Sequence, residues 1–83
     1  MLKTIKATFP DRYVAWNAIT EINRAHIVPR HEIQVESLDT SNPNGRTRLT
    51  ICTKVGHEYK DSIAMLKKYN PTELLDHKGK PIK

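Results

Sequence analysis

The sequence contains few of the residues on which nucleotide binding and disulfide-stabilised folding depend. Its 83 residues include three glycines and a single cysteine, Cys52. One cysteine excludes an intramolecular disulfide framework. No Gly-x-Gly-x-x-Gly or Walker-type loop occurs, and a backbone cradle for phosphate needs glycines at such spacings. The chain is therefore not expected to bind a nucleotide through its backbone.

Long apolar runs are also missing. No stretch approaches the roughly 18 apolar residues that a membrane-spanning helix requires. Residues 1–6 carry a charge at every third position and lack the apolar segment of a secretory signal. We therefore expect no membrane partner and a cytoplasmic location, where a lone thiol stays reduced.

The composition is that of one small folded domain. Hydrophobic residues make up 37% and charged residues 28% of the chain, with both signs interspersed. The net charge is +5, but Lys78, Lys80 and Lys83 lie in a C-terminal segment that contains Gly and Pro. The rest of the chain holds eleven Lys and Arg against nine Asp and Glu, a net charge of +2. We predict a single domain over residues 1–76 and a flexible basic tail over residues 77–83.

Two kinds of hydrophobic periodicity alternate along the chain. Apolar residues at every second position indicate strands, and apolar residues at every third or fourth position indicate helices. The order predicts strand, helix, strand, strand, helix and a short fourth strand, over residues 2–9, 13–25, 32–38, 47–55, 58–69 and 73–75. Asp11 is a suitable N-cap for the first helix, and Pro29 is expected to end it. Asn44-Gly45 predicts a hairpin between the second and third strands.

Each predicted element has one apolar face, so the elements can satisfy one another in two layers. A right-handed strand–helix–strand crossover places the first helix on one face of the sheet. The second helix must cover the same face, because the other face is polar. The predicted fold is α+β: a two-layer, ferredoxin-like sandwich with an antiparallel sheet and the order βαββα, followed by the short fourth strand.

One stretch of the sequence resembles a known family. Residues 9–19, Phe-Pro-Asp-Arg-Tyr-Val-Ala-Trp-Asn-Ala-Ile, followed by Glu-Ile-Gln-Val at 32–35, resemble the start of general stress protein 17M-like domains. The resemblance covers about 30 residues and implies a ferredoxin-like fold, while it implies little about activity. The chain departs from the family pattern at Pro29, where the family usually has Gly, and in its longer hairpin.

The residues that could carry catalysis or bind metal are scattered. The four histidines form neither a two-His helical pair nor a partnership with a Cys-x-x-Cys motif: His26, His31, His57 and His77. Cys52 should point to the polar face of the sheet, where His57 or Lys54 could activate it, but no residue supplies the orienting third group. We predict no catalytic residue, no metal site and no cofactor, hence a protein that is not an enzyme.

Basic residues are the candidate contacts on the polar face of the sheet. Lys6, Arg48 and Lys54 could gather there and contact an anionic partner. A surface that stacks single-stranded RNA needs exposed aromatic residues, and the exposed strand positions here hold none. The alternative is that Glu32 and Glu36 pair with these basic residues across the strands.

Aromatic residues on the predicted helices are the other candidates. Trp16, Tyr13 and Tyr59 could form a partner-binding patch, because Trp and Tyr are enriched at interface hot spots, or they could pack into the core.

The first functional hypothesis is a non-enzymatic protein-interaction or assembly module that acts as a homodimer. The alternative is a nucleic-acid-binding module that uses the basic sheet face and the tail. A small-molecule sensor domain is the third.

Overall fold

The computed structural model describes residues 2–54 and 56–82, and it contains every strand and helix that the periodicity predicts. The elements follow in the order β1 (Lys3–Phe9), α1 (Arg12–Arg24), a 3-10 turn η1 (Arg30–Glu32), β2 (Ile33–Ser37), β3 (Thr47–Thr53), α2 (Gly56–Lys68) and β4 (Glu73–Leu75). The short fourth strand is confirmed. Val55, the predicted end of the third strand, lies outside the described residues.

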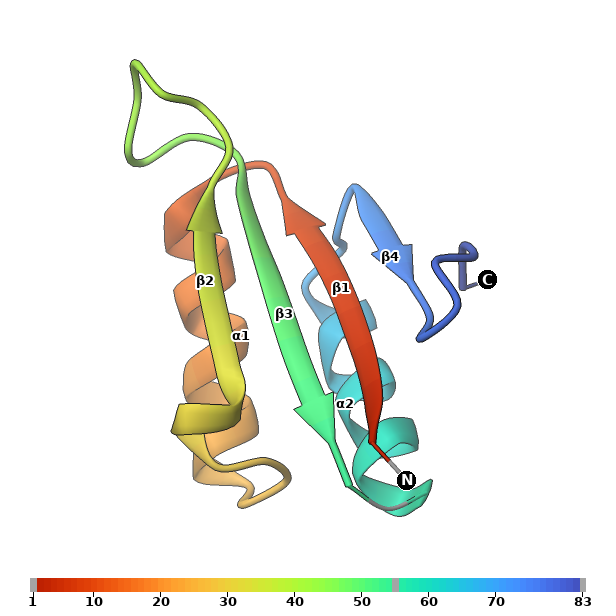
Figure 1. Ribbon diagram of the computed structural model, residues 1–83. Helices are drawn as coiled ribbons and strands as arrows, with labels where there is room; N and C mark the ends of the chain where they lie inside the picture. The colour runs from red at the N-terminus through yellow and green to blue at the C-terminus, as the bar shows by residue number, and fades with distance from the viewer. Residues whose placement is uncertain (1, 55, 83) are drawn as a thin grey trace.

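The strands form one antiparallel sheet in the order β2-β3-β1-β4 (Figure 1). Because β1 and β2 both pair antiparallel with β3, they run parallel to each other with β3 between them. The unit β1-α1-β2 is therefore a split βαβ, and β3-α2-β4 repeats it around β1. The predicted two-layer, ferredoxin-like α+β fold is confirmed.

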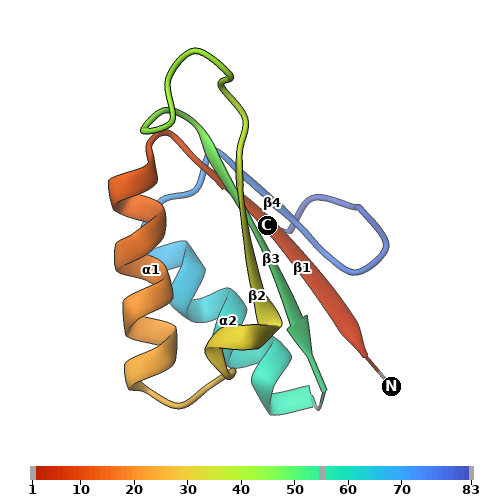
Figure 2. The ribbon, with the colours of Figure 1, turned by 60° about the vertical axis from the view of Figure 1, so that its left-hand side comes forward.

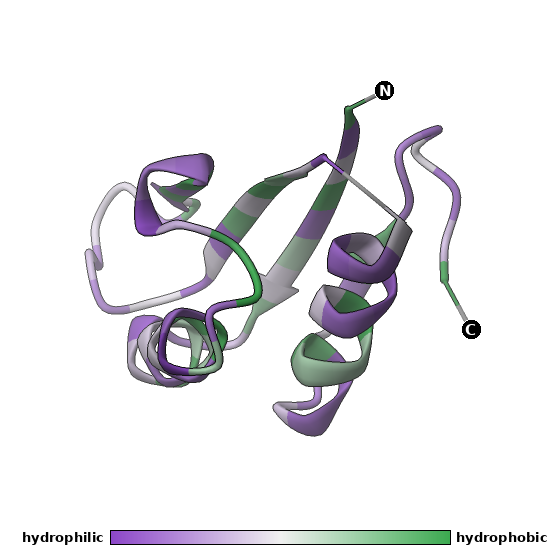
Figure 3. Cartoon of the chain, turned by 90° about the horizontal axis from the view of Figure 1, so that it is seen from below, coloured by the Kyte–Doolittle hydropathy of each residue, from purple (hydrophilic) through white to green (hydrophobic). Residues whose placement is uncertain are grey.

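Both helices cover the same face of the sheet, as the apolar pattern requires (Figure 2). Figure 3, which looks at the two layers end-on, shows α1 and α2 side by side against that face. Alternate residues of β1 and β3 point into the core, with Ile5, Phe9, Leu49 and Ile51 fully buried. The opposite face of the sheet carries no helix among the described residues, and we call it the open face.

Local signals explain where α1 begins and ends. The Asp11 carboxylate accepts a hydrogen bond of 2.8 Å from the Val14 N–H, which confirms Asp11 as the N-cap. The helix ends before Pro29, the residue expected to stop it. His26 adopts the left-handed conformation with φ of 55°, and the Ile27 N–H reaches back to the Ile22 carbonyl. This is the Schellman arrangement, so a turn of the backbone and not the proline ends α1.

The predicted hairpin between β2 and β3 is present but is not a tight two-residue turn. The Leu38 N–H donates to the Arg46 carbonyl at 2.9 Å and closes a loop over residues 39–45. Gly45 does not adopt a positive φ. A Cβ at this position would collide with Oδ2 of Asp39. Glycine is therefore needed here for its lack of a side chain and not for its conformational freedom.

The segment after β4 folds back along that strand. Oδ1 of Asp76 accepts hydrogen bonds from the N–H groups of Lys78 and Lys80, at 2.8 and 2.9 Å. The resulting turn brings Pro81 beside Leu75 as a β-bridge, and the Ile82 N–H donates to the Leu74 carbonyl at 2.8 Å. Residues 81 and 82, within the predicted flexible basic tail, thus lie along the outer edge of β4, and the residues before them form the turn.

Candidate functional site

A charged ladder crosses the open face of the sheet. The strand register places Arg48 between Glu36 on one side and Thr8 on the other, and Glu73 follows beyond Thr8. The Arg48 guanidinium lies 3.9 Å from a Glu36 oxygen and 3.8 Å from a Glu73 oxygen. The cross-strand pairing of Glu36 with a basic residue is confirmed. Two carboxylates therefore flank Arg48.

Of the other two basic candidates on this face, one lies near Arg48 and the other does not. Lys6 pairs with Thr50 and is a diagonal neighbour of Arg48. Lys54 follows the end of β3, four positions beyond Thr50, which at about 3.3 Å per residue is roughly 13 Å along the strand. The sequence places all three residues on one face, but the register separates Lys54 from Lys6 and Arg48.

Cys52 lines a shallow hollow of about 300 Å³ on the same face. Its other lining residues are Thr4, His31, Glu32, Gln34 and Thr50. Burial raises the pKa of the Cys52 thiol, and the charge of Glu32 and a hydrogen bond with it raise the pKa further. Lys54 opposes this shift without cancelling it. A raised pKa disfavours the thiolate, whereas a nucleophilic cysteine needs a depressed pKa.

Sequence reasoning paired Cys52 with His57 or Lys54 and missed Glu32. The register supplies the signal that could have found it. Because Gln34 lies opposite Thr50, the residue two positions before Gln34 falls opposite Cys52. His31 accompanies Glu32 there, with Nε2 at 3.3 Å from a Glu32 oxygen. Within residues 2–54 and 56–82, no group of three His, Cys, Asp or Glu side chains could hold a metal ion.

Exposed aromatic side chains lie together on the outer face of α1. Trp16 is 37% exposed and Tyr13 is 77% exposed. Two guanidinium groups lie over the Trp16 ring, with the Arg12 carbon at 5.8 Å and the Arg30 carbon at 5.2 Å from the ring centre. These are cation–π distances. We call Arg12, Tyr13, Trp16 and Arg30 the Trp16 patch.

Two shallow hollows share Trp16 as a lining residue. One, of about 540 Å³, is lined by Asp11, Arg12, Tyr13, Trp16 and Asn44. The other, of about 450 Å³, is lined by Trp16, Ile19, Thr20, Asn23, Arg24 and Arg30. Trp16 is thus the residue common to both hollows.

Arg30 connects this patch to the sheet. The residue opens η1, and its Nη1 donates to the Ile33 carbonyl at the start of β2, at 2.7 Å. The same guanidinium lies over Trp16, so one side chain touches both α1 and β2. In the described part of the chain, neither Arg12 nor Arg30 has a carboxylate within ion-pair distance.

The structure therefore brings two of the predicted contacts, Tyr13 and Trp16, onto one surface and adds two arginines that sequence reasoning missed. Arg12 stands four residues before Trp16, a spacing that predicts contact on a helix. Arg30 lies beyond the end of the helix and carries no such signal. Tyr59 lies elsewhere, on α2, in ring contact with His77 and with the Lys3 ammonium 5.2 Å from its ring centre.

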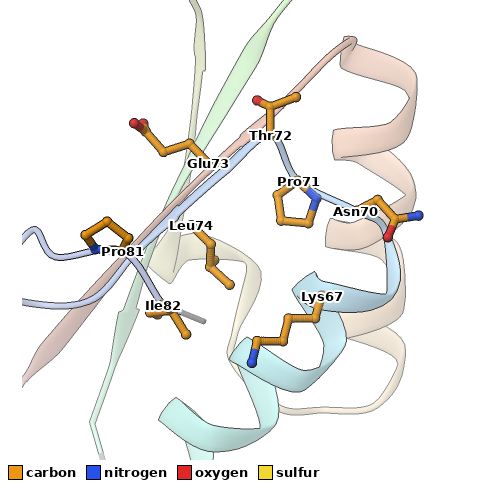
Figure 4. A pocket seen from close by; sticks show the side chains of 8 residues that line it. All are labelled: Lys67, Asn70, Pro71, Thr72, Glu73, Leu74, Pro81 and Ile82. Atoms are coloured by element: carbon orange, nitrogen blue, oxygen red, sulfur yellow. The ribbon is translucent and has the colours of Figure 1, made fainter.

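A third hollow, of about 530 Å³, lies where the C-terminal segment returns over the end of α2 (Figure 4). Leu74 and Ile82 contribute apolar side chains to it, and it is completed by Lys67, Asn70, Pro71, Thr72, Glu73 and Pro81. Ile82 also packs against the hydrophobic core, so this hollow is a consequence of how the C-terminal segment docks.

Comparison with protein-family models, with curated proteins and with solved structures finds no match to this chain. The resemblance to general stress protein 17M-like domains stays a prediction. None of the helices described is long and apolar enough to cross a membrane.

Proposed function

We propose that this protein is a non-enzymatic interaction module that binds another protein through the Trp16 patch. The observation that carries the proposal is the juxtaposition of Trp16, Tyr13 and two arginines on one exposed helix face. Trp, Tyr and Arg are the residues that contribute most to protein–protein binding. A core role does not account for Tyr13, because most of its side chain is in solvent.

The charges of the patch favour an acidic partner. A guanidinium that stacks on an indole keeps its edge N–H groups free to donate to a carboxylate in a bidentate pair. Both arginines already lie against the Trp16 ring, and Arg30 is also held by its hydrogen bond to the Ile33 carbonyl, so less side-chain entropy is lost on binding. The nearby Arg24 already pairs with Glu21, at 3.7 Å, and contributes less.

The rival hypotheses have weaker support. A nucleic acid would need a track of free cations, whereas Arg48 is balanced by two carboxylates and Lys54 stands apart. Self-association through the patch would bring Arg12 and Arg30 against a second copy of themselves. The homodimer and the sensor function expected from the sequence stay predictions that this surface does not favour.

The proposal is tested by quantitative affinity capture from lysate of the native host with three forms of the protein. Wild type is compared with Trp16→Ala and with Leu2→Ala, a matched loss of an exposed apolar side chain elsewhere, since Leu2 is 61% exposed. We expect a partner captured by wild type and Leu2→Ala and lost with Trp16→Ala. Titration of the purified partner should show affinity weakened by about 30-fold or more, as for a hot-spot residue.

Circular dichroism shows whether Trp16→Ala remains folded, and Arg30→Glu serves as a second variant that keeps the indole. Equal capture by all three forms, or binding that nuclease treatment abolishes, would overturn the proposal.

A further inference from the structure

The two outer edges of the sheet differ in a way that bears on how a partner docks. The edge of β4 is covered by the chain itself, through the bridge between Leu75 and Pro81 and the hydrogen bond from Ile82 to Leu74. The edge of β2 has no strand beside it among the described residues, as Figure 1 shows. An uncovered strand edge is a template for an extended segment of another chain.

The hydrogen-bond pattern tells which backbone groups of β2 face outward. Along an antiparallel pair, residues alternate between facing the partner strand and facing away from it. The Leu38 N–H donates to the Arg46 carbonyl of the pairing strand, so Leu38 faces inward, and so do Glu36 and Gln34. Ile33, Val35 and Ser37 must then face outward. The hydrogen bond from the Arg30 side chain to the Ile33 carbonyl is independent evidence that this carbonyl points away from β3.

The outward backbone groups of Ile33, the first of these three residues, are already bonded to Arg30. The Ile33 N–H donates to the Arg30 carbonyl, and the Ile33 carbonyl accepts from Nη1 of Arg30. The outward groups of Val35 and Ser37 have no partner in the part of the chain that the structure describes. Two residues, with one N–H and one carbonyl each, are thus available to a new strand.

We infer that this edge accepts an extended segment of the partner protein, which adds as a fifth strand beside Val35 and Ser37 and contacts the Trp16 patch with its side chains. The inference rests on the proposed function and names how the partner binds. Because the Arg30 side chain touches both the Trp16 ring and the start of β2, the ring and the open edge border one continuous surface.

A second copy of β2 fits this edge poorly. An antiparallel pair centred on Val35 places Ile33 opposite Ser37 of the other copy and requires the backbone groups that Arg30 occupies. A pair centred on Glu36 uses only Val35 and Ser37 but sets two Glu36 side chains directly opposite each other, which is destabilising. The occupant is therefore a segment of a different protein.

Side-chain alternation defines the chemistry of that segment. Residues opposite Val35 and Ser37 point toward the helix layer, where the Trp16 patch lies, and residues opposite Gln34 and Glu36 point to the open face. The segment should carry Lys or Arg opposite Glu36, an apolar residue opposite Val35 and a carboxylate near Arg30. For an antiparallel segment this order reads Thr-Lys-Val-Thr-Glu, from the residue opposite Ser37 to the residue opposite Ile33.

The test uses this peptide, acetylated and amidated, as the probe at millimolar concentration. In the control peptide, Lys and Val change places. The composition stays the same, but each of these two side chains then points to the opposite face of the sheet. Amide hydrogen exchange of the full chain is followed by NMR. We expect the in-phase peptide to slow exchange at Val35 and Ser37 by about fivefold at four times its Kd, since bound protein does not exchange at these sites. The control peptide should slow exchange at neither.

Equal slowing with both peptides, slowing at β4 instead, or no slowing with either would overturn the inference. Trp16 is the only tryptophan in the chain, so its indole signal reports the patch separately. A shifted indole without slowed exchange at Val35 would support binding at the patch and reject strand addition.

A second arm uses the partner captured through the Trp16 patch. Ser37→Pro removes one outward N–H at an edge position that tolerates proline, and Ser37→Ala keeps it. We expect Ser37→Pro to lose the partner and Ser37→Ala to retain it. Retention of the partner by Ser37→Pro, together with its loss by Trp16→Ala, would reject the strand and leave the proposed function standing.

Discussion

Asp39 accepts hydrogen bonds from both the backbone and the side chain of Arg46. Oδ2 receives the Arg46 N–H at 2.8 Å, and Oδ1 receives Nε at 3.1 Å and Nη2 at 2.8 Å. One carboxylate thereby holds together the two ends of the loop that joins β2 to β3. The loop places β2 in register, so this contact supports the edge at which we expect a partner to dock.

Asp39→Asn should lower the free energy of unfolding in a pH-dependent way. The Arg46 side chain, and then its backbone N–H, lower the pKa of Asp39 below its ordinary value. The wild-type carboxylate therefore contributes stability above the unfolded-state pKa, near 3.9, and loses it as the pH falls through the lower folded-state pKa. Urea unfolding should separate the two proteins at pH 7 and bring them together in strong acid. A difference that stayed constant with pH would contradict this.

Gly45→Ala should be destabilising, by about 1–3 kcal/mol, the usual effect of inserting a group into occupied space. The new Cβ would meet Oδ2 of Asp39 and would have to displace the carboxylate from Arg46. Gly56→Ala is the matched control, because a Cβ there meets no atom within 4 Å. In a helix this control should gain up to about 1 kcal/mol. Thermal unfolding that moved in the same direction for both variants would rule out the proposed clash.

Removal of two buried hydroxyl groups should change the stability of the fold in opposite directions. Ser62 is fully buried, and its Oγ has no hydrogen-bond partner among the described residues. Thr53 is equally buried, but its Oγ1 donates to the Lys3 carbonyl at 2.8 Å. Ser62→Ala should stabilise the fold by about 1 kcal/mol, and Thr53→Val should destabilise it by a similar amount. Chemical denaturation measures both, and a loss of stability in Ser62→Ala would indicate a partner for that hydroxyl.

Arg30→Ala should increase self-association. The substitution frees the Ile33 carbonyl and removes a cation from the Trp16 patch, while the Ile33 N–H still donates to the backbone carbonyl of residue 30. One of the two Ile33 groups that the β2 pairing centred on Val35 requires thus becomes accessible. Sedimentation velocity over a range of protein concentrations should show more dimer than in wild type. Arg24→Ala is the control, since Arg24 lines the neighbouring hollow and pairs with Glu21 but has no hydrogen bond to β2 among the described residues. Identical sedimentation of all three proteins would mean that Arg30 does not prevent self-association through the edge of β2.

The layers of this fold could be predicted because each strand and helix shows its buried face in its own sequence. Leu49 and Ile51 alternate with polar residues, and Ala15, Ala18, Ile19 and Ile22 recur at helical spacing, so local pattern and tertiary burial agree. Even β4 was detectable, although its three residues carry little periodicity.

The site could be predicted only in part, because its members come from distant parts of the chain. Tyr13 and Trp16 stand out as aromatic residues on a helix. Arg30 reaches Trp16 only because the Schellman turn at His26 redirects the backbone, and no local pattern shows that its side chain spans two elements. Glu73 was missed as a partner of Arg48 because a three-residue strand does not reveal its own register.

The return of the C-terminal segment over β4 has a consequence for larger assemblies. With that side closed by residues 81–82 and the β2 side open, a sheet that includes this domain can continue past β2 and not past β4. The domain can therefore stand at the end of a composite sheet but cannot link two such sheets together, which favours a pairwise complex over an open-ended fibre.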